Sequence, residues 1–407
     1  MSSMMLPAVG SDSQLSRESS FDESSTLVES SSVTSLVNAA GEFYQGYDVH
    51  DLLGKGLASA VRRCSEKSSG KSFAVKIIDL STEKQSAHDA QRLKEETRGE
   101  VEVLRILSGH ASIIQLHDFY DAGTSMFVVF ELAPGGELFD ALTRAVTFSE
   151  KRTKRVMRQI FDGVDYMHRH RVVHRDLKLE NILVMEGGGG DDVVKITDFG
   201  FAKVLREGET LDDLCGTPGY LAPEVLSAEY SKYRAISRRA SRVGRTQFDT
   251  VDLVGYSFEV DLWACGVIMY TLLAGYAPFY HRRQLTMLRK IQEGQYDLAK
   301  EPWNRISGPP KDLICQLLKV DVKERYTAKD AVSHPFIGYQ QPAERKITAK
   351  GRLKRGTICR PYRDRQIRHE SEAAVFAIYG HWITKGYTQS RDVLFASKPR
   401  PKRRKHA

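Results

Sequence analysis

The chain has 407 residues, five cysteines and a formal net charge of +8 at pH 7. This length suffices for one two-lobed core of about 300 residues with flanking tails. The cysteines include no CxxC pair and leave one unpaired, which argues against a disulfide framework and predicts a reducing compartment such as the cytoplasm. No apolar run approaches the roughly 20 residues of a membrane-spanning helix, and the first residues lack the features of a secretion signal, so neither membrane insertion nor secretion is expected.

Composition divides the chain into three predicted regions. Residues 1–40 contain 13 serines and few large apolar side chains, so we expect a disordered tail. Residues 41–336 carry the hydrophobic patterns of one folded domain. Residues 337–407 form a basic tail, with 18 Lys/Arg against 5 Asp/Glu from residue 340 onward, a balance of +13 that leaves −5 for the rest. This charge suggests nucleic acid, an anionic surface or an acidic regulatory protein as a partner, although the last ten residues could equally be solvated.

Hydrophobic patterns predict strands first and helices later. In chain order they predict strands at 47–53, 60–64 and 71–80, a helix at 89–107, strands at 113–120 and 126–132, and a helix at 148–169. Short strands at 181–185 and 193–197 flank a glycine-rich turn at 187–192, and the remainder is mainly helical apart from an insert rich in Arg and Ser at 227–256. This order is typical of an α+β protein with a small β-rich lobe and a larger helical lobe. A ligand is expected in the cleft between the lobes.

Small residues follow the first predicted strand, where 54–61 reads Gly-Lys-Gly-Leu-Ala-Ser-Ala-Val. Such a segment lets backbone N–H groups approach nucleotide phosphates, although Ser59 replaces the third glycine of the pattern and an ordinary hairpin is an open alternative. Lys76 lies on an apolar strand, where burial requires a fixed anionic partner. Glu100 on the next helix is the candidate, unless it faces water beside Glu102. The predicted ATP-binding residues of this region are Leu53, Gly54, Lys55, Gly56, Leu57, Ala58, Ser59, Ala60, Val61, Lys76 and Glu100.

The segment His-Arg-Asp-Leu-Lys-Leu-Glu-Asn at 174–181, which we call the catalytic loop, combines the groups that phosphoryl transfer needs. We expect Asp176 to orient the substrate hydroxyl and accept its proton, and Lys178 to neutralise charge on the transferred phosphate. Asn181 is expected to bind a magnesium ion. The loop resembles that of protein kinases, and this resemblance implies a serine/threonine kinase from its lysine, with Leu179 in place of the usual proline and no functional group removed.

Asp-Phe-Gly begins at Asp198, which is expected to chelate magnesium that bridges the β- and γ-phosphates. Together with Ala-Pro-Glu at 222–224, these motifs resemble the protein kinase family. The resemblance implies the bilobal kinase fold, ATP and Mg²⁺ as cofactors, and an activation segment (198–224) whose Glu224 pairs with Arg325. An inactive kinase that keeps only the fold is the alternative, but every catalytic position is filled. The resemblance also implies nucleotide contacts in the linker between the lobes, at Glu131, Ala133 and Glu137.

Further segments resemble the catalytic γ subunits of phosphorylase kinases. They lie at 42–45, 215–224, 261–267, 280–284, 293–296 and 377–382. Tyr-His-Arg-Arg-Gln at 280–284 is distinctive, and few other kinases share the Gly-His-Trp ending at 380–382. The resemblance covers 41–336 and much of the tail. It implies glycogen phosphorylase as substrate, calmodulin and regulatory α and β subunits as partners in a hetero-oligomer, and no nucleic-acid partner.

Asp213 stands where many kinases carry a phosphorylated residue that pairs with the arginine of the catalytic loop, here Arg175. A permanent carboxylate at this position predicts activity without activating phosphorylation, although the neighbouring Asp212 leaves open which carboxylate reaches the arginine. The predicted residues of this switch region are Arg175, Asp213, Thr217 and Glu224.

The peptide groove is expected to be acidic. Glu137, Glu180 and Asp213 would together match basic residues that flank the target serine of glycogen phosphorylase. For Glu180, a solvated surface charge is the alternative.

In the phosphorylase kinase γ family the segment after the kinase domain binds calmodulin and restrains the cleft. Here that segment is short, and 347–367 is too basic to resemble the first calmodulin-binding stretch, whereas 367–383 retains Phe376 and Trp382. Calmodulin binding by an amphipathic helix is expected there, with packing on the kinase or on another subunit as the alternative. A calmodulin-regulated kinase with other substrates and a non-catalytic scaffold are the competing functions.

Overall fold

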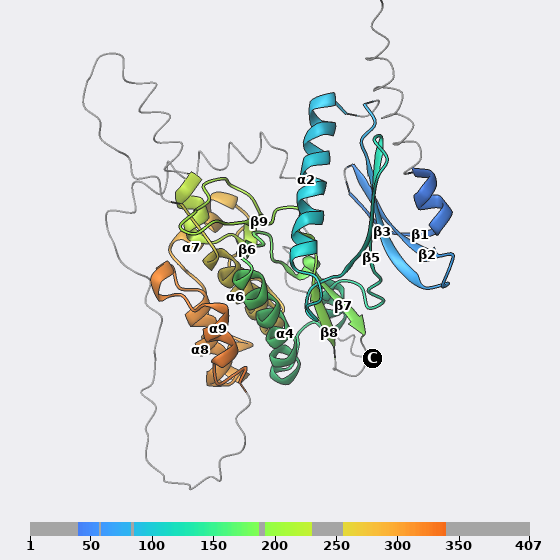
Figure 1. Cartoon of the computed structure of the whole chain (residues 1–407). Coiled ribbons are helices and arrows are strands. Elements are labelled where there is room, and N and C mark those ends of the chain that lie inside the picture. The colour runs from blue at the N-terminus through green and yellow to red at the C-terminus, as the bar shows by residue number, and fades with distance from the viewer. Residues whose placement is uncertain (1–39, 57, 83–84, 187–191, 230–254, 339–407) are drawn as a thin grey trace, which may run out of the picture.

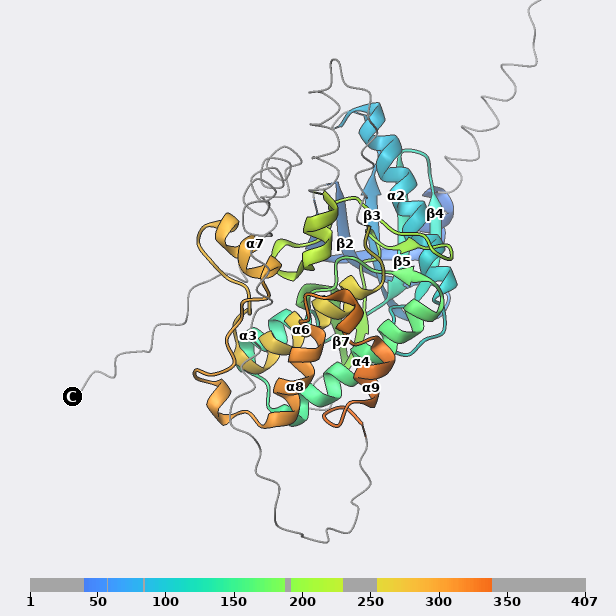
Figure 2. The ribbon, with the colours of Figure 1, turned by 90° about the vertical axis from the view of Figure 1, so that its left-hand side faces the viewer.

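The computed structural model describes residues 40–56, 58–82, 85–186, 192–229 and 255–338, which form two lobes (Figure 1). In Figure 1 and Figure 2 alike, a sheet with one long helix lies at one end and most other helices lie at the opposite end. The predicted α+β bilobal fold is confirmed. The predictions for the N-terminal tail up to residue 39, Leu57, the turn at 187–191, the insert from 230 to 254 and the tail from 339 concern residues outside those that are described.

The smaller lobe is an antiparallel five-stranded sheet packed with α2 (Ala87–Ile106). Its strands are β1 (Tyr47–Lys55), β2 (Ser59–Glu66), β3 (Ser72–Asp79), β4 (Leu116–Asp121) and β5 (Ser125–Glu131). They lie in the order β1-β2-β3-β5-β4. All five predicted strands and the predicted helix are present. β4 begins later than the predicted residue 113, because Ile113 pairs instead with Ile196 of the other lobe.

The core of the smaller lobe extends to a short helix at 40–46, which the sequence patterns did not predict. Phe43 of this helix is fully buried. Its ring stacks on Phe127 of β5 at a centroid distance of 4.2 Å and on Tyr47 at 5.4 Å. Aromatic pairs of this kind stabilise a core beyond their area burial. The chain is therefore anchored where it enters β1.

The larger lobe is built around α6 (Glu259–Ala274), in which every residue from Val260 to Ala274 is buried. A helix that is apolar on all sides must lie in the middle of a core. Both α4 and α8 contact α6 (Figure 2). The other helices of this lobe are α3 (Leu138–Ala145), α4 (Glu150–Arg169), α7 (Gln284–Gln292), α8 (Gly308–Leu317) and α9 (Ala328–Ser333), with a further helix at 223–229.

Short strands lie on either side of the catalytic loop and at the start of the activation segment. They are β6 (Val172–Val173), β7 (Ile182–Glu186), β8 (Val193–Ile196) and β9 (Lys203–Val204). The strands β7 and β8 agree with the prediction, and β6 pairs with β9 although neither was predicted. α4 starts at Glu150 and not at the predicted residue 148, because Ser149 is its N-cap and accepts a hydrogen bond from the Arg152 amide at 3.3 Å.

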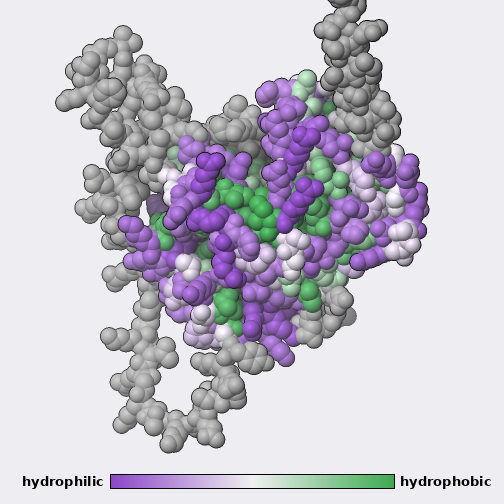
Figure 3. Space-filling model, viewed as in Figure 1, coloured by the Kyte–Doolittle hydropathy of each residue, from purple (hydrophilic) through white to green (hydrophobic). Residues whose placement is uncertain are grey.

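The surface around α2 is largely hydrophilic, and hydrophobic residues gather mainly near the centre of the face in Figure 3. The outer side of α2 explains the hydrophilic part, since Arg92, Glu95, Glu96 and Arg98 are exposed there. Within the described part of the chain, no helix combines the length and the apolar character that crossing a bilayer requires.

Candidate active site

The catalytic loop connects β6 to β7 and is buried among the core residues of the larger lobe. His174, Leu177 and Leu179 are fully buried, and Asp176 is almost so. Leu179 thus anchors the loop in the core at the position where a proline was expected. Arg175 has a φ of 71°, in the left-handed region that a long side chain seldom adopts. Such a backbone persists only where its surroundings hold it.

Asp261 of α6 holds this strained backbone. Its carboxylate accepts hydrogen bonds from the amides of His174 and Arg175, both at 2.9 Å, and lies 2.9 Å from His168 Nε2. Burial alone would raise the pKa of Asp261, but the hydrogen bond and charge of His168 and the His174 amide lower the pKa overall. The carboxylate is therefore charged and fully hydrogen-bonded inside the core.

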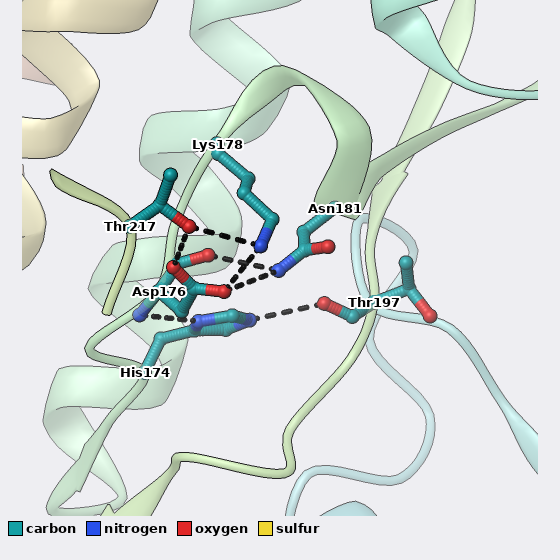
Figure 4. Close-up of polar contacts among 6 residues, drawn as sticks. All are labelled: His174, Asp176, Lys178, Asn181, Thr197 and Thr217. Atoms are coloured by element: carbon teal, nitrogen blue, oxygen red, sulfur yellow. Dashed lines mark hydrogen bonds and ion pairs between the residues drawn. The ribbon is translucent and has the colours of Figure 1, made fainter. Parts of the chain in front are cut away.

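Four polar side chains converge on Asp176 at the centre of the catalytic loop, three of them on its carboxylate and one on its amide (Figure 4). Thr217 Oγ1 donates to Asp176 Oδ1 at 2.7 Å, and Lys178 Nζ donates to Asp176 Oδ2 at 2.6 Å. The Asn181 amide donates to the Asp176 carbonyl at 2.9 Å. His174 Nδ1 accepts from the Asp176 amide, so its Nε2 carries the proton that it donates to Thr197 O at 3.0 Å. The three catalytic and metal-binding residues predicted in the loop thus lie together.

Lys178 is charged in this arrangement. Burial lowers the pKa of Lys178, but the adjacent Asp176 carboxylate and the charge of Asp198 raise it by more, so the pKa is raised overall. Lys178 Nζ also donates to Thr217 Oγ1 at 3.0 Å. An ammonium group is therefore fixed beside the carboxylate that is expected to accept a proton.

The predicted ion pair between β3 and α2 of the smaller lobe is present. Lys76 Nζ of β3 lies 2.8 Å from Glu100 Oε2, and the Glu100 side chain is only 4% exposed. Burial lowers the pKa of Lys76, but Glu100 and Asp198 raise it, and the pKa is raised overall. The alternative in which Glu100 faces water is wrong.

Asn181 and Asp198 are brought together by the pairing of β7 with β8. Ile182 lies opposite Ile196, and the Thr197 amide donates to Asn181 O at 2.9 Å, so Asp198 follows directly on the end of the paired strands. Asp198 has a φ of 62°. No cluster of three or more Asp, Glu, His or Cys suited to a metal occurs among the described residues. The oxygen donors of Asn181 and Asp198 nevertheless fit Mg²⁺, which commonly takes one or two protein oxygens and completes its shell with phosphate oxygens and water.

The glycine-containing segment forms the hairpin between β1 and β2. Gly54 lies opposite Val61, and the Gly56 amide donates to Ser59 O at 2.8 Å. Val61 in turn lies opposite Lys76 on β3. The hairpin interpretation is correct as a description of the backbone, and it is compatible with phosphate binding because the hairpin adjoins Lys76.

The linker between the lobes contains the predicted nucleotide contacts Glu131, Ala133 and Glu137. Glu131 Oε1 lies 2.6 Å from Lys195 Nζ and accepts from the Gln115 amide at 2.7 Å, so this carboxylate is occupied within the protein. The Glu131 amide also donates to Gln115 O at 3.1 Å. Farther along, Glu137 pairs as a β-bridge with Leu183, which places the linker from Ala133 onward against β7.

Asp213 is the carboxylate that lies on the arginine of the catalytic loop. Its Oδ1 is 2.7 Å from Arg175 NH1, and Arg175 Nε donates to Phe201 O at 2.7 Å. Burial raises the pKa of Asp213, but the guanidinium and its hydrogen bond lower it more, so the pKa is lowered overall. The arginine thereby links the catalytic loop to two points of the activation segment.

The end of the activation segment is held by the predicted structural ion pair. Arg325 donates to both carboxylate oxygens of Glu224, at 2.5 and 2.9 Å, and both residues are buried. Such a bidentate pair fixes geometry as well as charge.

Glu180 is partly buried, and its Oε2 has no hydrogen-bond partner among the described residues. Burial raises the pKa of Glu180, and the charges of Glu137 and Asp176 act in the same direction. This oxygen is therefore buried without a partner in the described part of the chain, in surroundings that disfavour its charge.

Sequence reasoning missed two supporting residues. Asp261 entered only through a family resemblance, although an aspartate at the start of an otherwise apolar helix signals a buried charge that needs partners. Gly216 has a φ of 102°, and a Cβ built there would lie 2.6 Å from Arg175 O. The activation segment therefore approaches the catalytic loop more closely than any side chain would permit.

Comparisons with known proteins show which family the chain resembles. A family model described as the protein kinase domain matches residues 47–239 and 245–337. The chain is 42% identical over 388 residues to the phosphorylase b kinase gamma catalytic chain, liver/testis isoform, of Homo sapiens, and the same figures hold for Bos taurus, with 89% of each chain covered. It is 38% identical over 302 residues to a calcium/calmodulin-dependent protein kinase type II of Caenorhabditis briggsae, covering 74% of this chain and 50% of that protein.

Proposed function

The chain belongs to the protein kinase family and is a serine/threonine protein kinase, and on this premise we propose that it phosphorylates a serine of glycogen phosphorylase with ATP. The extent of the similarity carries the proposal. The kinase-domain match lies within 47–337, whereas 89% of the chain aligns with the phosphorylase b kinase gamma chain. The likeness must therefore continue into the flanking regions, beyond what all kinases share. The similarity to the calmodulin-dependent kinase covers only 74% of the chain.

In the proposed reaction Asp176 accepts the proton of the serine hydroxyl while that oxygen bonds to the γ-phosphorus and the bond to the departing ADP oxygen breaks. Support comes from the hydrogen bonds that orient the Asp176 carboxylate, from Thr217 at 2.7 Å and Lys178 at 2.6 Å. The charged Lys178 would offset the negative charge on the transferred group. Little covalent chemistry is asked of the protein, so positioning accounts for most of its contribution.

Nucleotide and metal would be held by residues of both lobes. Asn181 and Asp198 would coordinate Mg²⁺, which when bound neutralises phosphate charge. Lys76, fixed by Glu100 at 2.8 Å, would contact the phosphates. Backbone groups of the 54–61 hairpin, which adjoins Lys76, would approach the same phosphates. The backbone at Glu131 and Ala133 would contact the base.

Substrate recognition would use the acidic side chains near the catalytic loop. Glu180 has an oxygen without a hydrogen-bond partner among the described residues, and the charge of Glu137 acts on it. A basic residue beside the target serine would offset the repulsion between the Glu180 and Glu137 carboxylates. Asp213 contributes less to such a groove than expected, since its charge is paired with Arg175.

Regulation would come from partners and not from phosphorylation of the activation segment. The Arg175–Asp213 pair supplies a carboxylate where a phosphate is otherwise required. Calmodulin and regulatory α and β subunits are proposed as partners through the tail, whose segment 367–383 lies outside the described residues. A cytoplasmic location fits such an assembly.

The proposal is tested by measuring phosphate transfer from MgATP to glycogen phosphorylase b and to a generic basic serine peptide. Asp198→Ala is the matched inactive variant, since it removes a proposed metal ligand. Fast labelling of phosphorylase that depends on Asp198 is expected. Labelling of the peptide alone would favour a kinase with other substrates, and labelling of neither would favour a non-catalytic scaffold.

A further inference from the structure

A buried tyrosine lies where the catalytic loop, the activation segment and the approach to α6 meet. Tyr256 is 3% exposed and comes just before α6. Its backbone exchanges both hydrogen bonds with Leu211 of the activation segment, at 2.8 and 2.9 Å, as an isolated antiparallel bridge. The preceding Gly255 approaches Thr210 so closely that an added Cβ would lie 2.2 Å from Thr210 Oγ1. The two segments are thus in intimate contact at this point.

The hydroxyl of Tyr256 makes two good hydrogen bonds. It donates to the backbone carbonyl of Asp213 at 2.6 Å and accepts from Arg175 NH1 at 3.1 Å. A longer contact of 3.4 Å to Asp213 Oδ1 cannot use the same proton well. One hydroxyl therefore joins the guanidinium of the catalytic loop to the main chain of the activation segment.

This link differs from the Arg175–Asp213 ion pair in exposure. The Asp213 side chain is 50% exposed, so water competes for its carboxylate, whereas Tyr256 is buried. Beyond the tyrosine, Asp261 accepts from the amide of the same arginine at 2.9 Å. The short stretch 256–261 thus contacts both the backbone and the side chain of Arg175, the residue that precedes the proposed base.

We propose that the Tyr256 hydroxyl is a positioning group for phosphoryl transfer, which holds Arg175 and the activation segment at Asp213 in their reactive arrangement. It acts through Arg175 on the orientation of Asp176 and does not touch the reacting atoms. The inference rests on the proposed function, in which Asp176 accepts the proton of the serine hydroxyl and must be oriented to do so.

The test compares two tyrosine-to-phenylalanine variants of the full chain. Tyr256→Phe leaves the Asp213 carbonyl and one Arg175 N–H without a partner. Tyr270→Phe is the matched control, because Tyr270 is 1% exposed, donates to Asp297 O at 2.9 Å and accepts from Trp303 Nε1 at 3.1 Å. Both variants lose one hydroxyl that bridges a carbonyl and an N–H donor inside the larger lobe.

Turnover of a basic serine peptide is measured for each variant, together with thermal unfolding. We expect kcat of Tyr256→Phe to fall about tenfold with KM for ATP within about twofold, since one unsatisfied buried pair is enough for such a loss. Tyr270→Phe should keep kcat within about twofold. The Tm should fall by a similar amount in the two variants, since each loses one buried hydroxyl. An unchanged kcat in Tyr256→Phe, or an equal loss in both variants, would overturn the proposal.

A second measurement needs no activity at all. Amide hydrogen exchange of peptides that cover 205–217 should be faster in Tyr256→Phe than in the unmodified chain and unchanged in Tyr270→Phe. Equal protection in all three proteins would refute the positioning role. If the chain labels the peptide but not phosphorylase, the proposed substrate fails while the role of Tyr256 is still decided by both readouts.

Discussion

The catalytic loop and the activation segment meet at Arg175 but are held in different ways. The loop's backbone is fixed by Asp261, whose side chain is 1% exposed, and the arginine side chain is paired with Asp213, whose side chain is 50% exposed. Water and salt compete with the second contact far more than with the first. The loop geometry is therefore part of the folded core, whereas the activation segment at Asp213 combines a half-exposed ion pair with the buried Tyr256 and the close approach at Gly216.

Of the changes that separate the two regions, removal of the Asp261 side chain should have the largest effect on stability and turnover. Asp261→Ala leaves two amides and His168 without their acceptor inside the core, and loss of one partner from such a buried network costs about 3–5 kcal/mol. We expect a loss of this size in the free energy of unfolding, measured by urea titration, and a loss of nearly all turnover.

The matched control is Asp165→Ala on α4. Asp165 pairs with Arg169 at 2.8 Å across one helical turn, and the Arg169 side chain is 65% exposed. Such a pair contributes less than about 1 kcal/mol. If Asp261→Ala unfolded no more easily than Asp165→Ala, the buried anchor assigned to the catalytic loop would be wrong.

Gly216→Ala should have the next largest effect, because it forces the activation segment away from the catalytic loop. The added Cβ would lie 2.6 Å from Arg175 O at a φ of 102°. Strain of about 1–3 kcal/mol is expected, with kcat lower by about thirtyfold. Gly208→Ala is the control, since its φ is 73° but no atom lies within 4 Å of the added Cβ. Equal kcat values for the two variants would show that close approach at Gly216 is not needed for turnover.

The contacts that the residues alone predicted are those whose partners are fixed by local spacing or by a strand and its neighbouring helix, whereas the distant pairs Arg175–Asp213 and Glu224–Arg325 were predicted only through the family resemblance. Asp176, Lys178 and Asn181 share one loop, so their convergence follows from the motif once the loop is recognised. Lys76 and Glu100 lie on consecutive elements, and a buried ammonium requires an anion. The chemistry of the candidate site was therefore largely predictable from these residues.

The contacts that the sequence did not predict join distant segments. The Glu131 carboxylate turns to Lys195, 64 positions away, and Asp261 reaches the His174 amide across 87 positions. Neither partner is marked by local periodicity, because tertiary packing alone decides which loop lies beside a strand end or a helix start. The closeness of Gly216 to Arg175 is of the same kind. The short helix at 40–46 was missed because its stability comes from Phe43 on the sheet and not from helical patterning.

A smaller loss is expected from the half-exposed ion pair. Asp213→Ala should lower kcat about fivefold, less than Gly216→Ala, because water partly replaces the lost carboxylate and Tyr256 still holds Arg175. Asp213→Glu, which keeps the charge, is the control and should recover most of the turnover. Undiminished turnover of Asp213→Ala on the serine peptide would sink the idea that this carboxylate replaces an activating phosphate.

The smallest effect concerns pH. The pKa of Asp213 is lower in the folded chain than in the unfolded one, so its stabilising contribution is complete above the unfolded value of about 4 and is lost as pH falls through the folded pKa. The difference in Tm between the unmodified chain and Asp213→Asn should therefore stay constant from pH 8 to about pH 5 and shrink below about pH 4. A difference that shrinks already between pH 8 and 6 would show that protonation of the Asp213 carboxylate is not what weakens this contact.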